Sequence, residues 1–567
     1  MGFDRVYDDR PDENIAVRDQ HDQRRLRRRR PYGRSGCGQL PDDRADTRHV
    51  HHHAAPGARD DGPFGNQGLG GVHLRVYKRL ALALAAVLAT LGIGSPAALA
   101  ATPYQGYTYN HKFEPVSSLN GYVYTDSIDG FDNEGGPLNK PQDLYIAGDD
   151  TLYIADTGNN RIVHLDANKR LLGTYGAAEG SGKLNGPKGV FATPDGDVYV
   201  ADTKNSRIAV FDKSGKFTKE FRAPESPLLG KDFLYLPSKL IVDKRGYLFI
   251  VCDGLYQGLL QLDPDGLFAG FFGANHVPFS MTRVLTNLIA TKEQKAQIAG
   301  EKPPEFSNLY QDQEGFIYTT TLGIETLQIK RLSAVGVDTL NEQESALGRY
   351  GDYRMRVMGE KRKVNSFVDV TVSAQGFITA LDLITGRAFQ YDSLGNLLFQ
   401  FGGIGVQNGL FITPSSIAQT SDGTIYVADE SRNRIDRFRI TAFGELVHKA
   451  SVLYSDGRYE EAQQPWAEVA KLNSNYNLAY VAIGKSLYKQ EKYKEALVYF
   501  KQARAYNEYS NAFLEQRKLF LREHFAEAVA IIIAAAVLLR LLLGWRRRRR
   551  KRATLVSAAA TGRGGAS

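Results

Sequence analysis

The stretch DVYVADTKNSRIAVFD, at residues 197–212, recurs along the chain and decides its fold. Two close copies are TLYIADTGNNRIVHLD at 151–166 and TIYVADESRNRIDRFR at 424–439. Weaker copies begin at residues 247, 316 and 377. Each copy contains two short apolar strands around a polar turn. A further apolar run and a tight turn such as Asp195-Gly196 precede each copy, so every repeat supplies the strands of one small antiparallel sheet.

Six such repeats predict the architecture of the chain. The tight turns before the first three copies are roughly 46 to 50 residues apart, and longer spacings mark two insertions. Four-stranded repeats at this period close into a propeller, with one blade for each repeat. We therefore predict a mainly β fold, with a six-bladed β-propeller at 141–444 after a lead-in at 101–140. In the lead-in, GYVYTDSI at 121–128 is a candidate outer strand for the blade where the ring closes.

The copies share Val-Ala-Asp or Ile-Ala-Asp, then Asn, then Arg-Ile, and this pattern resembles the NHL repeat. The resemblance implies that the shared Asp and Arg are mainly structural. Their spacing places them at the two feet of a hairpin, where the carboxylate accepts hydrogen bonds from turn N–H groups and from the guanidinium. The alternative is a ring of ligand-binding residues at one mouth of the propeller. The expected pairs are Asp156 with Arg161, Asp202 with Arg207, Asp382 with Arg387, and Asp429 with Arg434.

Two insertions interrupt the repeats, and loops of this kind often carry binding functions. The first, at 278–300, has apolar residues at helical spacing. Met281, Leu285 and Leu288 belong to this apolar stripe and are candidates for a partner surface. The alternative is a helix that packs across one face of the propeller. The second insertion, at 334–365, is polar and predicts a long loop or hairpin.

After the propeller the apolar residues recur at helical spacing, and two segments align with a shift of 34 residues. The pair resembles tetratricopeptide repeats, which implies a peptide-binding or assembly module. We predict helix hairpins and a capping helix at 445–524, with small residues where helices approach and aromatic residues beside them. The predicted packing residues are Ala450, Ala462, Trp466, Gly484, Ala496 and Phe500. The exposed side of the first helix of each repeat is a further candidate contact surface.

The two ends of the chain predict its location in the cell. Residues 1–75 lack lysine and any apolar period, so they cannot build a core, and we interpret them as the product of a misplaced start. Residues 76–100 have the basic start, apolar run and small-residue cleavage motif of a signal peptide. Residues 525–545 are apolar and long enough to cross a bilayer, and a basic tail follows at 546–567. Because basic flanks stay in the cytoplasm, we predict a single-pass protein of the cell membrane with a cytoplasmic C-terminus and an extracytoplasmic bulk at 101–524.

The sequence lacks the common motifs for catalysis and for nucleic-acid binding. The net charge of +8 comes from the terminal segments, and residues 101–545 carry −4, which argues against a nucleic-acid partner. We find no Walker loop, serine-hydrolase elbow, Cys-x-x-Cys pair or dinucleotide fingerprint. The histidines after residue 100 are not spaced as metal ligands, and Cys252 fits a core residue. We therefore predict no catalytic residues, no metal and no cofactor.

Together, these observations favour binding over a reaction. We predict a membrane-anchored extracytoplasmic binding or scaffold protein that recognises a protein partner or another ligand through its propeller and helical repeats. Transporter components and a carbohydrate ligand, linked to carbohydrate uptake, are candidates. The alternative is an extracellular propeller hydrolase or lyase of the lactonase type, which requires carboxylates and amides that converge at the channel.

Overall fold

The computed structural model describes residues 102–131, 135–230, 233–274, 303–341, 350–352 and 365–561. The candidate partner residues Met281, Leu285 and Leu288 lie outside the described residues, and so do the segments 1–75 and 76–100. Only parts of the second insertion are described.

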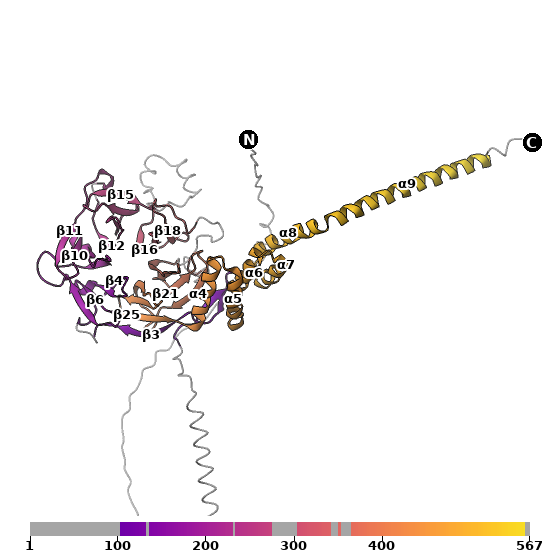
Figure 1. Ribbon diagram of the computed structural model, residues 1–567. Helices are drawn as coiled ribbons and strands as arrows, with labels where there is room; N and C mark the ends of the chain where they lie inside the picture. Colours follow the sequence, from indigo (N-terminus) through magenta and orange to yellow (C-terminus); the bar gives the residue numbers. More distant parts are fainter. Residues whose placement is uncertain are drawn as a thin grey trace, which may run out of the picture. The chain divides into compact units, whose positions relative to one another are not determined.

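Six antiparallel sheets are arranged as the blades of a propeller (Figure 1). Blades 1 and 2 contain β4 (Pro141–Ile146), β5 (Leu152–Asp156), β6 (Arg161–Leu165), β7 (Leu171–Tyr175), β8 (Pro187–Ala192), β9 (Val198–Asp202), β10 (Arg207–Phe211) and β11 (Phe217–Phe221). Blades 3 and 4 contain β12 (Pro237–Val242), β13 (Leu248–Cys252), β14 (Leu259–Leu262), β15 (Phe268–Phe272), β16 (Phe306–Gln311), β17 (Ile317–Thr321) and β18 (Ile329–Leu332). Blades 5 and 6 contain β19 (Phe367–Val372), β20 (Ile378–Asp382), β21 (Arg387–Tyr391), β22 (Leu397–Gly402), β23 (Pro414–Gln419), β24 (Ile425–Asp429), β25 (Arg434–Ile440) and β3 (Tyr122–Ile128). Short 3-10 helices lie between strands at η1 (Thr157–Asn159), η2 (Thr203–Asn205) and η3 (Pro227–Leu229).

The ring is closed by a strand from the beginning of the folded chain. β3 pairs antiparallel with β25, from Ile128 opposite Ile435 to Tyr122 opposite Ile440. The innermost strands of neighbouring blades contact one another in the order β4, β8, β12, β16, β19, β23 and back to β4. The last blade therefore combines strands from both ends of the propeller sequence, so the ring cannot open without breaking a sheet.

The turn after each innermost strand needs a backbone conformation that glycine adopts readily. Between β8 and β9, Gly196 has a φ of +93°, and its N–H donates to the carbonyl of Thr193 at 2.9 Å. The corresponding residue has a positive φ in all six blades, at Asp150, Gly196, Gly246, Gly315, Gly376 and Gly423. Glycine at five of these positions avoids the steric cost that a side chain brings to this conformation.

Six helices follow the propeller in the described part of the chain: α4 (Ala442–Ser455), α5 (Tyr459–Leu472), α6 (Asn477–Lys489), α7 (Tyr493–Ala503), α8 (Tyr506–Glu523) and α9 (Phe525–Thr561). Helices α4 to α8 pack in sequence, each against the next. The predicted packing residues Ala450, Ala462, Trp466, Ala496 and Phe500 are at most 2% exposed. A Cβ added at Gly484 would lie 2.6 Å from the ring of Phe500, so only glycine allows this approach.

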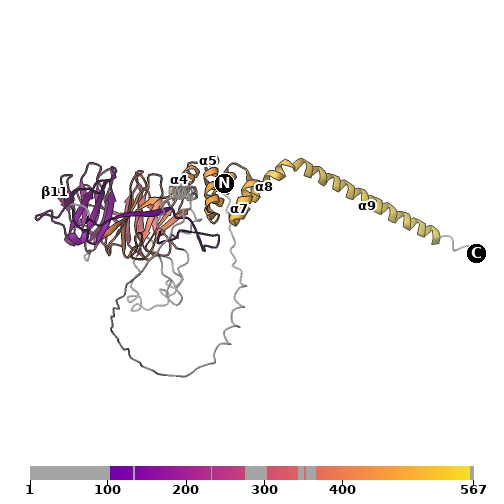
Figure 2. The same ribbon diagram turned by 90° about the horizontal axis from the view of Figure 1, so that it is seen from below.

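The helices α4 to α6 pack beside blades 5 and 6 through one continuous core. In this core the imidazole of His448 on α4 stacks on Phe377, with ring centroids 3.8 Å apart. Tyr476, which precedes α6, donates from its hydroxyl to the carbonyl of Leu398 at 2.8 Å. Figure 2 shows these helices at the edge of the propeller, next to the blades with which they share the core. A small hairpin of β1 (Tyr107–Tyr109) and β2 (Pro115–Ser117) precedes β3.

The last helix, α9, contains the predicted membrane span. Its residues Phe525–Ala553 are long and apolar enough to cross a membrane, and they are not buried in the protein. Within the described residues, α9 is the one helix with these properties. It continues through the basic run without a break.

Candidate functional site

The candidate site is a belt of residues on the innermost strands. In all six blades, the pairing of the innermost strand with the next strand shifts register between its first and third residues. Such a bulge bends the strand and redirects the side chain beside it. The third residues are Asp143, Gly189, Lys239, Asn308, Asp369 and Ser416, and we call them the central belt.

One side of the central belt is an ion pair that reaches across a whole blade. The Lys239 Nζ in blade 3 lies 2.5 Å from Asp143 Oδ1 in blade 1, and it also donates to the carbonyl of Gln142 at 2.8 Å. Gly189 of blade 2 lies between them in the ring. A Cβ at Gly189 would lie 2.5 Å from the carbonyl oxygen of Ser238 and 3.0 Å from the Cα of Lys239. Glycine therefore lets the two innermost strands approach closely beside the ion pair.

The other side of the central belt is organised by Asp369. Its carboxylate accepts from Asn308 Nδ2 at 2.6 Å, from Ser416 Oγ at 2.5 Å and from the N–H of Ile417 at 2.8 Å. The same Ser416 Oγ lies 3.3 Å from Asp143 Oδ1. Ser416 thereby connects the two carboxylates, and the central belt links the blades directly.

The central belt contains two carboxylates, those of Asp143 and Asp369, and one ammonium group, that of Lys239. The pKa of Asp369 is raised to about 7, chiefly by burial; the charge of Lys239 acts to lower it and the charge of Asp143 to raise it. Burial also raises the pKa of Asp143 above its ordinary value. Near neutral pH the pair therefore holds a proton in part of the molecules, and this proton takes the place of a second cation.

The central belt is an interior network that binds its own members. Its five residues other than glycine are at most 8% exposed, and the carboxylates are engaged by the donors described above. Within the described residues, no group of three or more His, Cys, Asp or Glu side chains could hold a metal ion. The arrangement can store a proton and fix the blades to one another.

Sequence reasoning did not single out the central belt, although the repeats contain a signal for it. Four of the innermost strands begin with proline, which is tolerated at the first residue of a strand. In these strands the residue two positions after the proline belongs to the belt. An alignment of the repeats on Pro141, Pro187, Pro237 and Pro414 would have brought these positions together.

Two of the four expected hairpin pairs are formed. The Nε of Arg161 donates to Asp156 Oδ2 at 2.7 Å, and the Nε of Arg207 donates to Asp202 Oδ2 at 2.8 Å. Both carboxylates are fully buried. Asp202 also accepts from the backbone N–H of Asn185 at 2.7 Å, so the pair closes its hairpin onto the preceding loop.

In the other two blades the arginine forms its ion pair with a different carboxylate. Arg387 donates to Asp352 Oδ2 at 2.9 Å, while Asp382 is occupied by Asn365, Ser366 and Thr385. Arg434 pairs with Asp436 at 2.8 Å, while Asp429 accepts backbone N–H groups from Ile412 and Thr413. The expected pairing is therefore wrong here, because a competing acid lies within reach of each arginine. All four aspartates still anchor loop backbone, as expected from their position.

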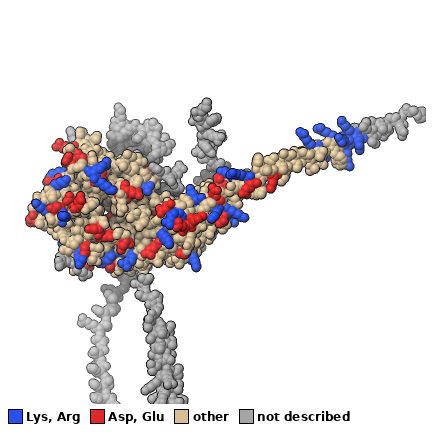
Figure 3. All heavy atoms as spheres, viewed as in Figure 1, with Lys and Arg blue, Asp and Glu red and all other residues tan. Residues whose placement is uncertain are grey.

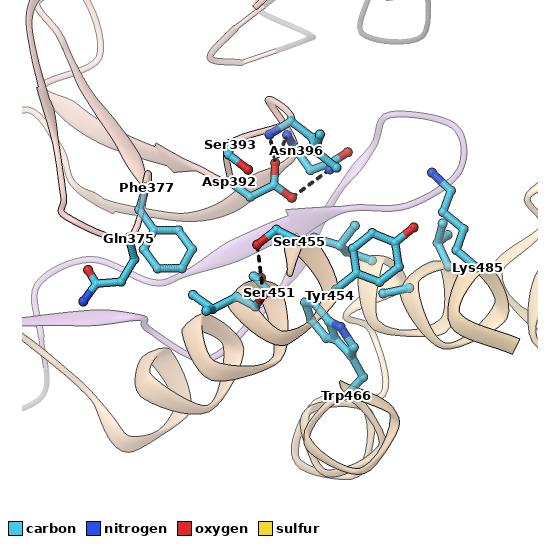
Figure 4. Close-up of a pocket in the computed structure, with 15 residues that line it drawn as sticks. Gln375, Phe377, Asp392, Ser393, Asn396, Ser451, Tyr454, Ser455, Trp466 and Lys485 are labelled. Carbon is cyan, nitrogen blue, oxygen red and sulfur yellow. Dashed lines mark hydrogen bonds between the residues drawn. The ribbon is translucent and has the colours of Figure 1, made fainter. Parts of the chain in front are cut away.

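A small pocket lies between blade 5 and helices α4, α5 and α6 (Figure 4). On the blade side, Asp392 accepts from Leu394 N at 2.9 Å and from Asn396 Nδ2 at 2.8 Å, and burial raises its pKa. On the helix side the lining includes Tyr454, Trp466 and Lys485. The volume of about 60 Å³ has room for only a few water molecules.

The pocket also shows that the first helices of the two pairs face the propeller. Its lining includes Ser451 and Tyr454 of α4 together with Ala482 and Lys485 of α6, opposite residues of blade 5. One side of each of these two helices is therefore partly covered by the chain's own propeller, and a contact surface on their exposed side stays a prediction. Sequence periodicity identified the helical faces but not which neighbour would cover them.

Comparison with known protein families finds one match. The family model of the NHL repeat matches residues 184–211, which include β9 and β10. No curated protein is significantly similar to the chain.

Solved structures with a related chain course include three that differ in described role. The virginiamycin B lyase from Staphylococcus aureus is 12% identical, with a TM-score of 0.35, and the match covers 56% of this chain and 100% of that one. A protein described as a proposed gluconolactonase is 12% identical, with a TM-score of 0.34 and coverage of 60% and 98%. The extracellular domain of a proposed hybrid two-component system from B. thetaiotaomicron is 15% identical, with a TM-score of 0.31 and coverage of 59% and 40%. The chain therefore contains a six-bladed β-propeller, and the NHL-repeat model matches residues 184–211 within it.

Proposed function

We propose that this protein is a membrane-anchored binding protein, in which the propeller and helices α4 to α8 form one extracytoplasmic body that recognises a partner or ligand. The observation that carries the proposal is the continuous core between the blades and the helices. A scaffold must hold its recognition modules in a fixed relation, and a shared core does this more firmly than a flexible linker.

A chain of contacts from the helices to the closing strand supports this rigidity. His448 of α4 lies 2.6 Å from Gln390 Oε1 of β21. The amide of Gln390 donates to the hydroxyl of Tyr122 on β3 at 3.0 Å. Phe443 of α4 adds an edge-on contact with Phe399 of β22, at a centroid distance of 6.0 Å. One buried network therefore joins the helices to the strand that closes the ring.

The central belt supports binding over catalysis. The carboxylates of Asp143 and Asp369 are the most acid–base-competent groups on the innermost strands, and both are buried and engaged by neighbouring donors. Catalytic acids and bases must reach a reacting atom. The donors and acceptors of the central belt are hydrogen-bonded to one another, and such a network is better suited to keeping the propeller rigid than to catalysis.

The C-terminal helix supports the anchor and its orientation. Figure 3 shows that most of the α9 surface is uncharged and that Lys and Arg side chains gather towards its far end. Seven consecutive basic residues, 546–552, form this cluster, and basic flanks are retained in the cytoplasm. Protease added outside intact cells should therefore digest the segment 102–524. Protection of the propeller from the protease would contradict the proposed orientation.

The binding proposal is tested with the full chain in proteoliposomes and a panel of lactones, esters and oligosaccharides. Each compound is followed by thermal shift and by chromatography of its products. We expect at least one ligand class to raise Tm in a saturable way without forming product. Saturable turnover would contradict the proposal. If Asp369→Asn also abolished that turnover while the variant stayed folded, the central belt would be an active site and the lactonase-type alternative would be favoured.

A further inference from the structure

We propose that helix α8 lies in the headgroup layer of the membrane that α9 crosses, with an apolar stripe turned towards the acyl chains. The stripe consists of Phe513, Leu514, Phe520 and Leu521, and we call it the α8 stripe. The proposal rests on the proposed anchorage through α9. It adds a second membrane contact, which fixes how the propeller is held relative to the membrane surface.

The α8 stripe is an exposed apolar face of α8, which also exposes Tyr506 and, at 36%, Leu519. Its four residues occupy positions i, i+1, i+7 and i+8, which share one side of an α-helix. Their exposed fractions are 47% for Phe513, 50% for Leu514, 59% for Phe520 and 57% for Leu521. Ala512, on the opposite side, is fully buried, so α8 packs on the protein with one face and presents the stripe with the other.

Chain connectivity identifies the membrane as the occupant of this face. α8 ends at Glu523 and α9 begins at Phe525, so only His524 separates them. With a rise of about 1.5 Å per residue, Leu521 is roughly 6 Å from the start of the apolar span along the chain. Phe513 and Phe520 are about 10 Å apart along the helix axis, and a helix parallel to the surface places both rings at the same depth.

The charged residues around the stripe fit a headgroup layer. The Arg517 guanidinium lies 6.0 Å from the centre of the Phe513 ring, and Arg522 is exposed near the end of the helix. Long basic side chains can keep their apolar stems beside acyl chains while their heads reach phosphate. Glu515 and Lys518 form an ion pair at 2.7 Å, and Lys518, four residues after Leu514 and three before Leu521, borders the stripe. Apolar, aromatic and basic residues are therefore arranged as interfacial helices require.

The test measures the depth of single spin labels in the full chain, reconstituted in phosphatidylcholine vesicles with a minor share of phosphatidylglycerol. Cys37 is replaced by Ser, and Cys252, at 2% exposure, stays out of reach of the label. Labels are placed with Phe513→Cys and Phe520→Cys on the stripe. Val498→Cys on α7, where the side chain is 63% exposed, is the matched control. Val537→Cys reports on α9 itself.

We expect labels at 513 and 520 to collide more often with oxygen than with a water-soluble nickel chelate, as at 537, and the label at 498 to show the reverse. Suppose that the labels at 513 and 520 collide mainly with the nickel chelate, like the label at 498, while the label at 537 collides mainly with oxygen. The α8 proposal is then wrong, and the anchorage through α9 stands. If the label at 537 also collides mainly with the nickel chelate, the anchorage through α9 is itself wrong. If the labels at 513 and 520 are shielded from both reagents, and each spectrum is broadened by the same label on another chain, a second copy of the chain covers the stripe and the membrane contact is overturned.

Discussion

Asp369 shows how burial changes the chemistry of a single residue in this propeller. Its carboxyl has four donors, Asn308 Nδ2, Ser416 Oγ and the N–H groups of Val370 and Ile417. Its negative charge and that of Asp143 are opposed by the single ammonium group of Lys239. The consequence is a pKa near neutrality at the centre of a fold that has no obvious acid–base motif. The stability of the protein should therefore depend on pH in a direction that can be stated.

The first prediction concerns this pH dependence. The pKa of Asp369 is about 7 in the folded protein, against about 3.9 in an unfolded chain. Between these values the folded protein binds more protons, so its free energy of unfolding falls as the pH rises from about 4 to about 7. Asp369→Asn imitates the protonated form and should remove most of this decrease. The pKa of Asp143 is also raised, so the free energy of unfolding of the variant should still fall with rising pH, with a smaller slope.

Urea unfolding of both proteins across this pH range measures the effect. Above about pH 7, the free energy of unfolding of the variant should equal or exceed that of the wild type. As the pH falls towards about 4, the wild type should gain stability relative to the variant. An identical pH slope in both proteins would show that Asp369 is ionised throughout.

The second prediction concerns Gly189, where the neighbouring strand leaves no room for a side chain. Gly189→Ala places a Cβ 2.5 Å from a backbone carbonyl of the next blade, and such overpacking costs about 1–3 kcal/mol in the free energy of unfolding. Gly173 on β7 is a matched control, because a Cβ there meets no atom within 4 Å. Gly173→Ala should change stability by no more than about 0.5 kcal/mol. Equal effects in denaturant unfolding would contradict the close approach of β8 and β12.

At the scale of elements, α4 is attached to blade 5 by a neutral histidine. Burial lowers the pKa of His448 to about 4, against about 6.5 in an unfolded chain. The unfolded chain therefore binds more protons between these values, and stability falls as the pH drops from about 6.5 to about 4. This slope is opposite in sign to that of Asp369.

The third prediction follows from replacing His448 by phenylalanine, which keeps the stacking on Phe377 and removes the titrating group. His448→Phe leaves Gln390 Oε1 without its partner and should cost about 1–2 kcal/mol at neutral pH. The further loss on acidification should be smaller in the variant than in the wild type. Near-UV circular dichroism during unfolding at several pH values measures both effects. If acid destabilises both proteins equally, His448 does not control the attachment of α4.

The elements that could be predicted from the sequence are those that depend on short spacings. The repeat period indicated the blades, and the five-residue spacing indicated the bonds of Asp156 to Arg161 and of Asp202 to Arg207. The same spacing failed at Arg387, because its partner Asp352 comes from a loop 35 residues earlier. Spacing describes a hairpin, and it contains no information on which acid another loop brings close.

The central belt could not be predicted for the same reason. Ser416 meets Asp369 across 47 positions of the sequence and Asp143 across 273. These contacts exist only when the ring is closed, and the ring depends on β3 pairing with β25. The junction pocket has the same origin, because it needs helices and blade 5 to be in place together.

At the scale of the whole molecule, the propeller and helices α4 to α6 behave as a single mechanical body in our proposal. The core of blades 5 and 6 continues into α4, α5 and α6, and the closing strand is bonded through Gln390 to the same helices. A ligand or partner bound on the propeller would then be held in a fixed relation to helices α4 to α6. This coupling is the central claim, since the proposed binding function depends on it.

Hydrogen–deuterium exchange of the full chain under native conditions tests that claim most directly. If the body is one cooperative unit, the slowest amides of α4 to α6 and of strands β19 to β25 should exchange with the same free energy and respond equally to added urea. Exchange of the helical amides at a clearly lower free energy, while the blades remain protected, would show two separate bodies and contradict the account.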